Sequence, residues 1–257
     1  MMHTVYLQAE QLVVRIGQHA ACCGLDLQVE AGQHWAILGR NGAGKSTLLS
    51  VLAGLRPPTD GRVTVNQQTY REMGARQAAQ WRGWLAQQQG DAFASSVLET
   101  AVAGRHPHLA RWDWEGENDL RIARQALLAV GLHAFEARDV QTLSGGERQR
   151  LAIATLLCQQ PHLFLLDEPL THLDLNHQVA VLDLFRAQTD AGAAIVSVLH
   201  DPGLAWRYAS HVLLVHGDGR TEQGRRDDIL TSERLSALYG HPLQRFELNG
   251  QVGFLPG

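Results

Sequence analysis

Residues 34–55 read HWAILGRNGAGKSTLLSVLAGL, which is an apolar run, a glycine-rich loop and an amphipathic segment in direct succession. The first six residues have the length of a buried strand, and residues 46–55 carry apolar side chains at helical spacing. Gly54 and the pair Pro57–Pro58 end that helix. A strand that leads through glycines into a helix predicts an α/β unit with a phosphate site at the helix start.

The loop itself, residues 39–46, fits the pattern G-x-x-x-x-G-K-[ST]. Glycines let consecutive backbone N–H groups turn inward around phosphate oxygens, and the following helix adds its positive end. Lys45 would reach the β- and γ-phosphates of a nucleotide, and the Ser46 hydroxyl suits Mg²⁺. The plainer alternative is a loop that only caps the helix. We favour phosphate binding, and the predicted residues are Gly39, Asn41, Gly42, Ala43, Gly44, Lys45, Ser46 and Thr47.

A second apolar run, LFLLDEP at residues 163–169, ends in two acids. Because ligands of open α/β sheets bind at the carboxyl ends of the strands, both acids would emerge beside the phosphates. Asp167 would hold Mg²⁺ through water, and Glu168 would orient and polarise the attacking water as a general base. The alternative is an ordinary exit from a strand into a turn, but the upstream phosphate loop favours catalysis.

Strand and helix patterns alternate at both ends of the chain, and a mostly helical stretch separates them. Short strands are predicted at 12–16, 25–29 and 62–68, and further strands at 162–169, 193–200 and 211–217. This order predicts an α/β core with a parallel sheet. We assign residues 1–87 and 162–235 to a catalytic core, 88–161 to a helical subdomain and 236–257 to a C-terminal extension.

Residues 143–150, LSGGERQR, stand between the phosphate loop and the acidic strand end. Ser144 and Glu147 have the spacing of a capping box, which accounts for a helix start. It does not account for two adjacent glycines, which weaken a helix but leave its first N–H groups open to a phosphate. With this string the chain resembles the ATP-binding cassettes of ABC proteins over nearly its whole length.

Three further positions carry the same resemblance. Gln87, in WLAQQQ, is similar to the family's Q-loop glutamine. Residues 171–174, THLD, resemble the D-loop. His200 ends the strand-like stretch AAIVSVLH and matches the switch histidine.

The resemblance implies a P-loop NTPase (RecA-like) core, an N-terminal antiparallel β subdomain and an inserted α-helical subdomain. It also implies a head-to-tail homodimer with two ATP molecules, each held by the phosphate loop of one chain and the signature of the other. Ser144 and Gly146 would then serve the partner's γ-phosphate, and Gly145 and Asp174 are further nucleotide-binding residues that the resemblance implies. Gln87 would sense the γ-phosphate and join Ser46 and Asp167 at Mg²⁺. His200 would contact the γ-phosphate, so the expected catalytic residues are Glu168, His200 and Gln87.

The adenine contact departs from the family pattern. Many cassettes stack adenine on an aromatic residue upstream of the phosphate loop, and the matching position here is Ile16. Base–aromatic stacking contributes roughly 1–3 kcal/mol in other nucleotide sites, and an aliphatic side chain gives less. We therefore expect modest ATP affinity and weak base selectivity, with His19 as an alternative contact.

Residues 104–108, GRHPH, are similar to an element of importers for iron–siderophores, haem and vitamin B12, and LTSERLSALYGHPL near the end resembles the same group. This implies transmembrane permease subunits and, through them, a substrate-binding protein, with the chain at the cytoplasmic face of the membrane. Four tryptophans either pack in the core or form a groove that receives a permease helix. They are Trp81, Trp84, Trp112 and Trp114.

The composition is that of an ordinary globular protein, with 45% apolar residues, 19% charged residues and a formal net charge of −4. No basic excess suggests nucleic acid as the main partner. The three cysteines lack the spacing of a disulfide framework, which fits a reducing compartment. We expect no signal peptide, and no stretch approaches the roughly 18 apolar residues of a membrane span, so a membrane role would come through a partner.

Two other functions remain open from the sequence. A soluble ABC ATPase of DNA repair or translation would usually carry a coiled-coil insertion, a zinc module or a second cassette, and none is visible here. A small-molecule P-loop kinase has no use for LSGGE.

Overall fold

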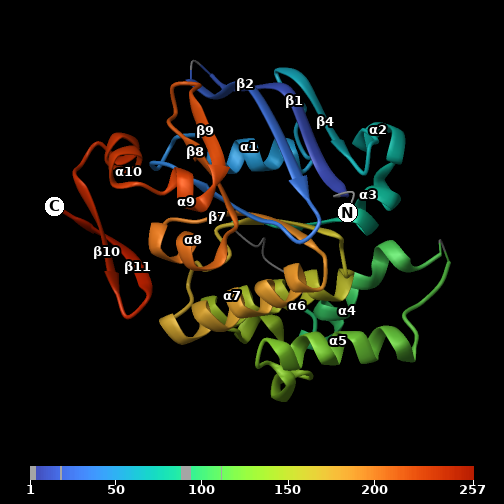
Figure 1. Ribbon diagram of the computed structural model, residues 1–257. Coiled ribbons are helices and arrows are strands. Elements are labelled where there is room, and N and C mark those ends of the chain that lie inside the picture. The colour runs from blue at the N-terminus through green and yellow to red at the C-terminus, as the bar shows by residue number, and fades with distance from the viewer. Residues whose placement is uncertain (1–3, 18, 88–93, 111) are drawn as a thin grey trace.

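The computed structural model describes residues 4–17, 19–87, 94–110 and 112–257. A six-stranded sheet in the order β5-β6-β7-β3-β8-β9 lies at the centre (Figure 1). Its members are β5 (Arg82–Leu85), β6 (Leu163–Asp167), β7 (Ala194–Val198), β3 (His34–Leu38), β8 (His211–Val215) and β9 (Thr221–Arg225). Neighbouring strands run parallel except β8 and β9. Every residue of β3, β6 and β7 is buried, as expected for parallel strands covered on both faces.

A second, antiparallel sheet has the order β2-β1-β4 and is formed by β1 (Val5–Ile16), β2 (His19–Glu30) and β4 (Asp60–Val65). Helix α1 (Lys45–Leu52) lies between the two sheets (Figure 1), and its leucines share one core with Leu7, Leu27 and Ile37. Strands β1 and β2 are much longer than predicted. Gln11 has a positive φ of 46° at a register shift, so an irregular residue interrupts β1 without ending it.

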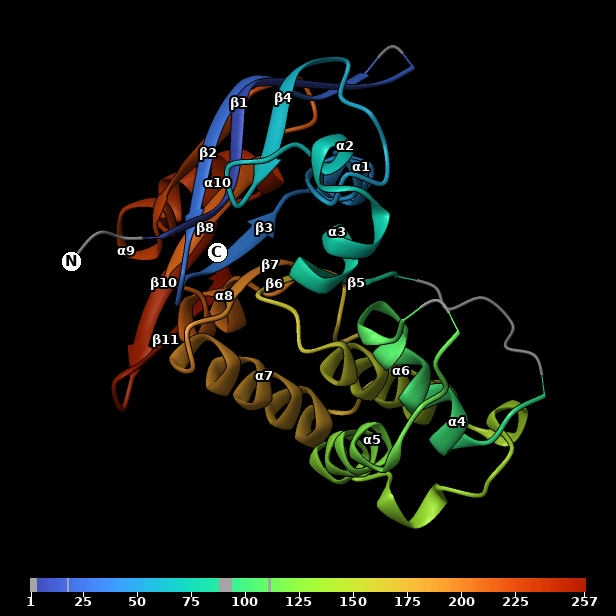
Figure 2. The same ribbon diagram turned by 90° about the vertical axis from the view of Figure 1, so that its right-hand side faces the viewer.

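The helical part comprises α4 (Val97–Val102), η1 (Ala103–His108), α5 (Glu117–Ala129), η2 (His133–Phe135), η3 (Val140–Thr142) and α6 (Gly145–Gln159). It lies on the side of the central sheet opposite β1, β2 and β4 (Figure 2). Together with α7 (Leu175–Asp190) it encloses a core in which Phe164 meets Phe185 edge to face. These features confirm the predicted fold class. Residues 88–93 of the predicted helical subdomain lie outside the described residues.

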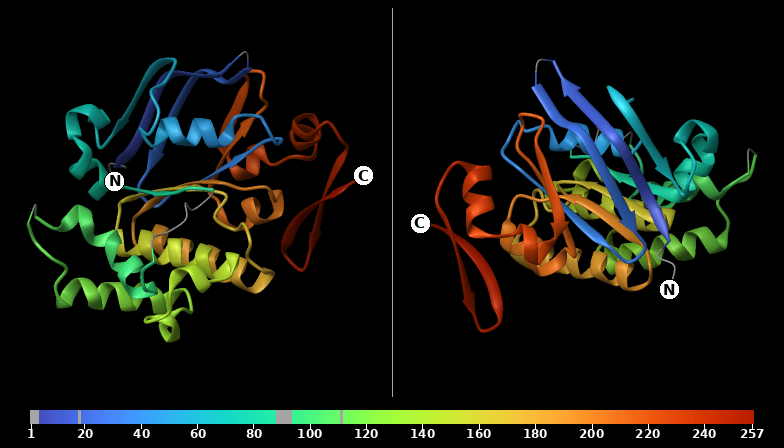
Figure 3. Two further views of the ribbon diagram at one scale, coloured as in Figure 1. Left: turned by 180° about the vertical axis from the view of Figure 1, so that it is seen from behind. Right: turned by 45° about the horizontal axis from the view of Figure 1, so that its top comes forward.

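The remaining helices are α2 (Tyr70–Met73), α3 (Ala75–Trp81), α8 (Pro202–Tyr208), α9 (Arg226–Ile229) and α10 (Ser232–Tyr239). The chain closes with a hairpin of β10 (Leu243–Leu248) and β11 (Gln251–Pro256), which stands out from the body (Figure 3). Phe254 and Arg245 fasten the hairpin to Trp206 on α8. Within the described ranges, no helix combines the length and apolar character needed to cross a membrane.

Candidate nucleotide-binding site

The carboxyl ends of the central strands surround a cavity of about 460 Å³. The loop from β3 to α1 forms one wall, and the ends of β1, β5 and β6 bring further residues to it. Ten residues line it, all of them predicted at the sequence level: Ile16, Asn41, Gly42, Gly44, Lys45, Ser46, Thr47, Gln87, Glu168 and His200. Segments more than 180 residues apart in sequence therefore meet at one concave site.

The loop takes its shape from glycines at two particular points. Gly44 has φ of 93°, a left-handed conformation that side chains rarely adopt. At Gly39 a Cβ atom would lie 2.4 Å from the Val215 carbonyl oxygen, so only glycine fits against β8. The ammonium of Lys45 sits inside the loop and donates to the Gly39 and Arg40 carbonyls at 2.8 and 3.1 Å. Loop and lysine together form a preorganised cradle for an anion.

Ser46 lines the cavity, and its hydroxyl donates to a carboxylate oxygen of the buried Asp167 at 2.8 Å. Burial raises the pKa of Asp167, the hydrogen bond from Ser46 opposes this, and neighbouring Glu168 adds to it. Burial also lowers the pKa of Lys45, against the attraction of Glu168 and Asp167. One hydroxyl and one carboxylate are hard oxygen donors of the kind Mg²⁺ uses together with phosphate oxygens, so the residues fit that ion.

Glu168 is held at an unusual backbone angle, with φ of 52° directly after β6. Such a conformation is sparsely populated for a non-glycine residue and needs support from its surroundings. The Glu168 carboxylate contacts His200 Nε2 at 2.9 Å and receives a long hydrogen bond of 3.5 Å from the Thr171 hydroxyl. The turn therefore aims a carboxylate into the cavity beside an imidazole. Thr171 in this supporting role was not singled out from the sequence.

Ile16 lies at the end of β1, 38% exposed, with its Cδ1 atom 2.9 Å from where a Cβ of Gly44 would be. This places an aliphatic side chain at the mouth of the cavity, as expected. His19 faces Ile16 across the β1–β2 register but is not among the cavity-lining residues. Gln87, exposed at the end of β5, does line it.

The signature residues do not line the cavity of their own chain. Ser144 caps α6, and Glu147 donates its backbone N–H to the Ser144 hydroxyl at 3.3 Å in a complete capping box. A Cβ atom on Gly146 would lie 2.9 Å from the His172 carbonyl oxygen. Close packing inside the chain is thus a second reason for this glycine, one that the sequence reasoning missed.

The remaining predicted contact, Asp174, is likewise not among the residues that line the cavity. It caps α7 and binds His177 Nδ1 at 2.8 Å. Gly39, Ala43 and Asp167 support the cavity without lining it, whereas Ser144, Gly145, Gly146 and Asp174 form a separate group around His172.

The chain is similar to known proteins over most of its length. The family description "ABC transporter" matches residues 22–171. The ferric enterobactin transport ATP-binding protein FepC of Escherichia coli (strain K12) is 36% identical over 238 residues, which cover 91% of this chain and 87% of that protein. The hemin import ATP-binding protein HmuV of Gloeobacter violaceus is 39% identical, with 91% of this chain and 87% of that protein covered.

Two solved structures share the fold. An inward-facing metal-chelate type ABC transporter contains a chain that superposes with a TM-score of 0.85 at 30% identity, and 98% of each chain is covered. A dimeric ATP-binding cassette bound to ADP and phosphate has a TM-score of 0.74 at 24% identity, covering 86% of this chain and 98% of that one.

Proposed function

The chain belongs to the ABC transporter family, and we propose on that basis that two copies close head to tail around two ATP molecules to drive a membrane permease. Subunits of this family bind and hydrolyse ATP to power transport, so the chain is an ATPase that works with a permease. The observation that supports the dimer is the position of Ser144, which caps a helix outside the chain's own cavity. A helix start with two glycines suits a phosphate, and because this one lies outside the chain's own cavity, the phosphate would be one bound by another chain.

In the proposed site, each side chain has one task. The 39–46 loop and Lys45 bind the triphosphate, while the partner's Ser144 and Gly146 close over the γ-phosphate. Glu168 accepts a proton from the attacking water, and His200, 2.9 Å from Glu168, stabilises charge at the γ-phosphate. Ser46, Asp167 and Gln87 would hold Mg²⁺, which would neutralise phosphate charge. Closure excludes water and ties hydrolysis to pairing.

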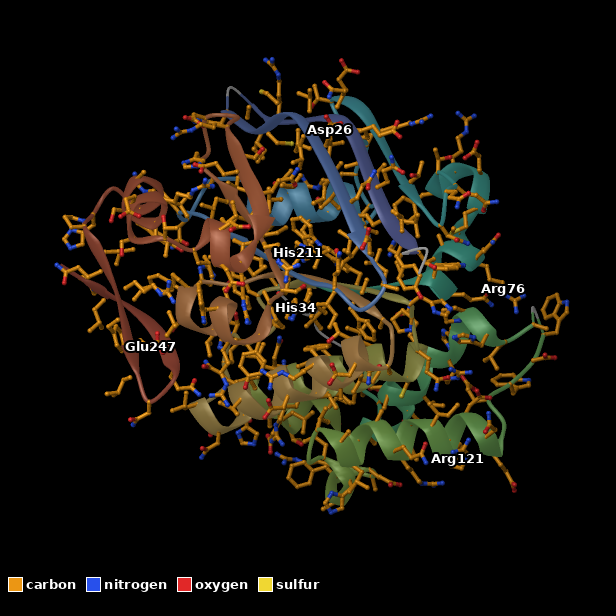
Figure 4. All side chains as sticks on the ribbon, in the orientation of Figure 1. Asp26, His34, Arg76, Arg121, His211 and Glu247 are labelled. Carbon is orange, nitrogen blue, oxygen red and sulfur yellow. The ribbon has the colours of Figure 1, made fainter. Side chains whose placement is uncertain are left out.

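The permease is proposed to dock at a hollow of about 760 Å³ between α3 and η1. Arg76 and Gln80 of α3 both donate to the Pro107 carbonyl and so bridge the core to the helical part. Figure 4 labels Arg76 on the side of the molecule where α3 approaches the helical part. Trp81 lines the hollow, and both Trp81 and Trp84 pack on the core. Trp112 and Trp114 follow η1 closely in sequence and are 84% and 88% exposed, which is unusual for this residue outside an interface.

The Trp112→Ser and Trp114→Ser double variant is expected to keep its basal ATPase rate and to lose most permease stimulation. The reason is that exposed indoles commonly anchor protein interfaces. Purified permease in vesicles, titrated against each variant, gives the measurement. Leu128→Ser is the matched control, because Leu128 is 61% exposed on α5. Unchanged coupling in the double variant would defeat the groove proposal.

The proposed cargo is an iron–siderophore, haem or cobalamin, taken up with a substrate-binding protein while this chain stays at the cytoplasmic face. Support comes from the names of the two relatives and from GRHPH at 104–108. Arg105 of that element is buried and binds Asp119, the Cys158 carbonyl and Gln160. Arg105 therefore fastens η1 to the end of α6, and the permease would select the cargo.

Co-purification with the permease and ATP-dependent uptake into vesicles test this function. Failure to bind any permease would contradict the transport function and favour a soluble ABC ATPase of DNA repair or translation. The relatives reported above are transporter subunits, so that alternative gains no support from them.

Ile16 gives a separate prediction on nucleotide choice. We expect an ATP over GTP preference below about tenfold, because an aliphatic contact cannot replace base stacking. Ile16→Tyr should raise the affinity for both nucleotides at least about fivefold, since stacking adds roughly 1–3 kcal/mol. Equilibrium binding of labelled nucleotides measures this, with Leu55→Tyr, at an exposed site outside the cavity, as the control. A preference above tenfold that Ile16 variants leave untouched would contradict it.

A further inference from the structure

The signature helix α6 touches the catalytic turn of its own chain at two points. Near its start, Gly146 packs directly under the His172 carbonyl, with room for no side chain. One turn further along, the Gln149 amide donates to the Pro169 carbonyl at 2.9 Å. Gln149 is 4% exposed, so this bond is shielded from water. Helix and turn are therefore joined side by side by a buried polar contact and a close steric one.

The turn that carries Glu168 also has two backbone hydrogen bonds of its own. Thr171 N–H donates to the Glu168 carbonyl at 3.2 Å, and Leu173 N–H donates to the Leu170 carbonyl at the same distance. The Pro169 carbonyl lies between these two acceptors and receives the Gln149 amide. Because Glu168 has a positive φ, its neighbours must hold the backbone against relaxation. Gln149 reaches the turn immediately after the strained residue.

We propose that Gln149 is a positioning residue for ATP hydrolysis, which ties the Pro169–Leu170 peptide, one residue after Glu168, to the signature helix. The inference rests on the proposed role of Glu168 as general base. Misplacement of a reacting group by about 1 Å can cost roughly 100-fold in rate, so a fixed carbonyl next to the base matters. In a head-to-tail dimer the start of α6 contacts the partner's ATP. Gln149 then couples binding of the partner's ATP to the position of the Glu168 carboxylate, which faces the chain's own ATP.

A matched control exists on α7. Gln178 donates its side-chain amide to the Leu173 carbonyl at 3.1 Å, in the same β6–α7 connection but beyond His172. Changing either glutamine to methionine removes one amide-to-carbonyl bond and keeps a side chain of similar length. A general loss of loop stability would lower the ATPase rate of both variants alike. If Gln149 positions Glu168, only the Gln149 variant loses activity.

The test compares Gln149→Met, Gln178→Met and wild type by ATPase kinetics, ATP binding and thermal unfolding. We expect Gln149→Met to lower kcat about tenfold. Its ATP affinity should stay within about twofold of wild type, and Gln178→Met should keep kcat within about twofold despite a similar loss of thermal stability. The Hill coefficient for ATP should also fall in Gln149→Met alone. Gln149→Leu, which also lacks a donor, serves with the same expectation if the methionine variant is insoluble.

An unchanged kcat in Gln149→Met, or an equal fall in both methionine variants, would overturn the positioning role. So would a loss confined to ATP affinity. These results differ from a failure of the proposed function, in which Glu168→Gln would hydrolyse ATP at the wild-type rate whatever stands at position 149.

Discussion

Glu168→Gln is expected to bind ATP as well as wild type does and to hydrolyse it at least about 100-fold more slowly. A positioned general base contributes roughly 10²–10⁴-fold to a rate, and the amide cannot accept the proton from water. The glutamine keeps the size of the glutamate and can still bind His200, which now lies 2.9 Å from the carboxylate. The backbone at φ 52° is held by the turn and not by the carboxylate charge, so folding should be preserved.

Single-turnover hydrolysis and equilibrium binding separate the two effects in this variant. Glu136→Gln provides the control, because Glu136 pairs with Arg124 in the helical part and lies outside the cavity. Hydrolysis by Glu168→Gln near the wild-type rate would remove Glu168 from the mechanism, and weak ATP binding would assign it a different role.

Lys45→Met should weaken ATP binding by roughly 10–100-fold and leave no measurable turnover, since hydrogen bonds from a charged donor contribute about 1.5–3 kcal/mol each. Lys45 is 5% exposed, and its ammonium already lies inside the loop that would bind the phosphates. Lys45→Arg should fail as well, because the longer, planar guanidinium does not match the loop that encloses the compact Lys45 ammonium at the Gly39 carbonyl.

Arg40→Met is the control for this pair, since it removes a charge from the exposed side of the same loop. The sequence contains a single lysine, so an amine-reactive reagent can modify only Lys45 and the N-terminal amine. ATP should protect Lys45 from that reagent in wild type. Equal ATP affinity in Lys45→Met and wild type would contradict the assignment of the loop.

The cavity could be predicted residue by residue because its determinants are local. The 39–46 loop sets its own backbone through glycines, and Glu168 follows a strand whose burial is visible in LFLLD. The structure adds that all ten lining residues come together, including Ile16, Gln87 and His200, which only the family resemblance indicated. Ser144 and Asp174 cap α6 and α7. Both lie outside the chain's own cavity, so a role at the nucleotide requires a second chain.

Other features escaped the sequence reasoning for two different reasons. The β10–β11 hairpin had a readable signal, since Asn249–Gly250 between alternating apolar residues is a typical two-residue hairpin turn, and both residues have positive φ. The contacts of Gln149 with Pro169 and of Gly146 with His172 join segments some 20 residues or more apart. No local pattern reports such contacts, because they depend on how α6 packs against the end of β6.

The most direct test is the structure of the Glu168→Gln variant in saturating ATP and Mg²⁺, together with its mass in solution. A two-fold dimer is predicted, in which each γ-phosphate lies within hydrogen-bond distance of Lys45 of one chain and Ser144 of the other. A nucleotide-loaded monomer, or a dimer in which Ser144 lies far from the partner's phosphate, would contradict the account.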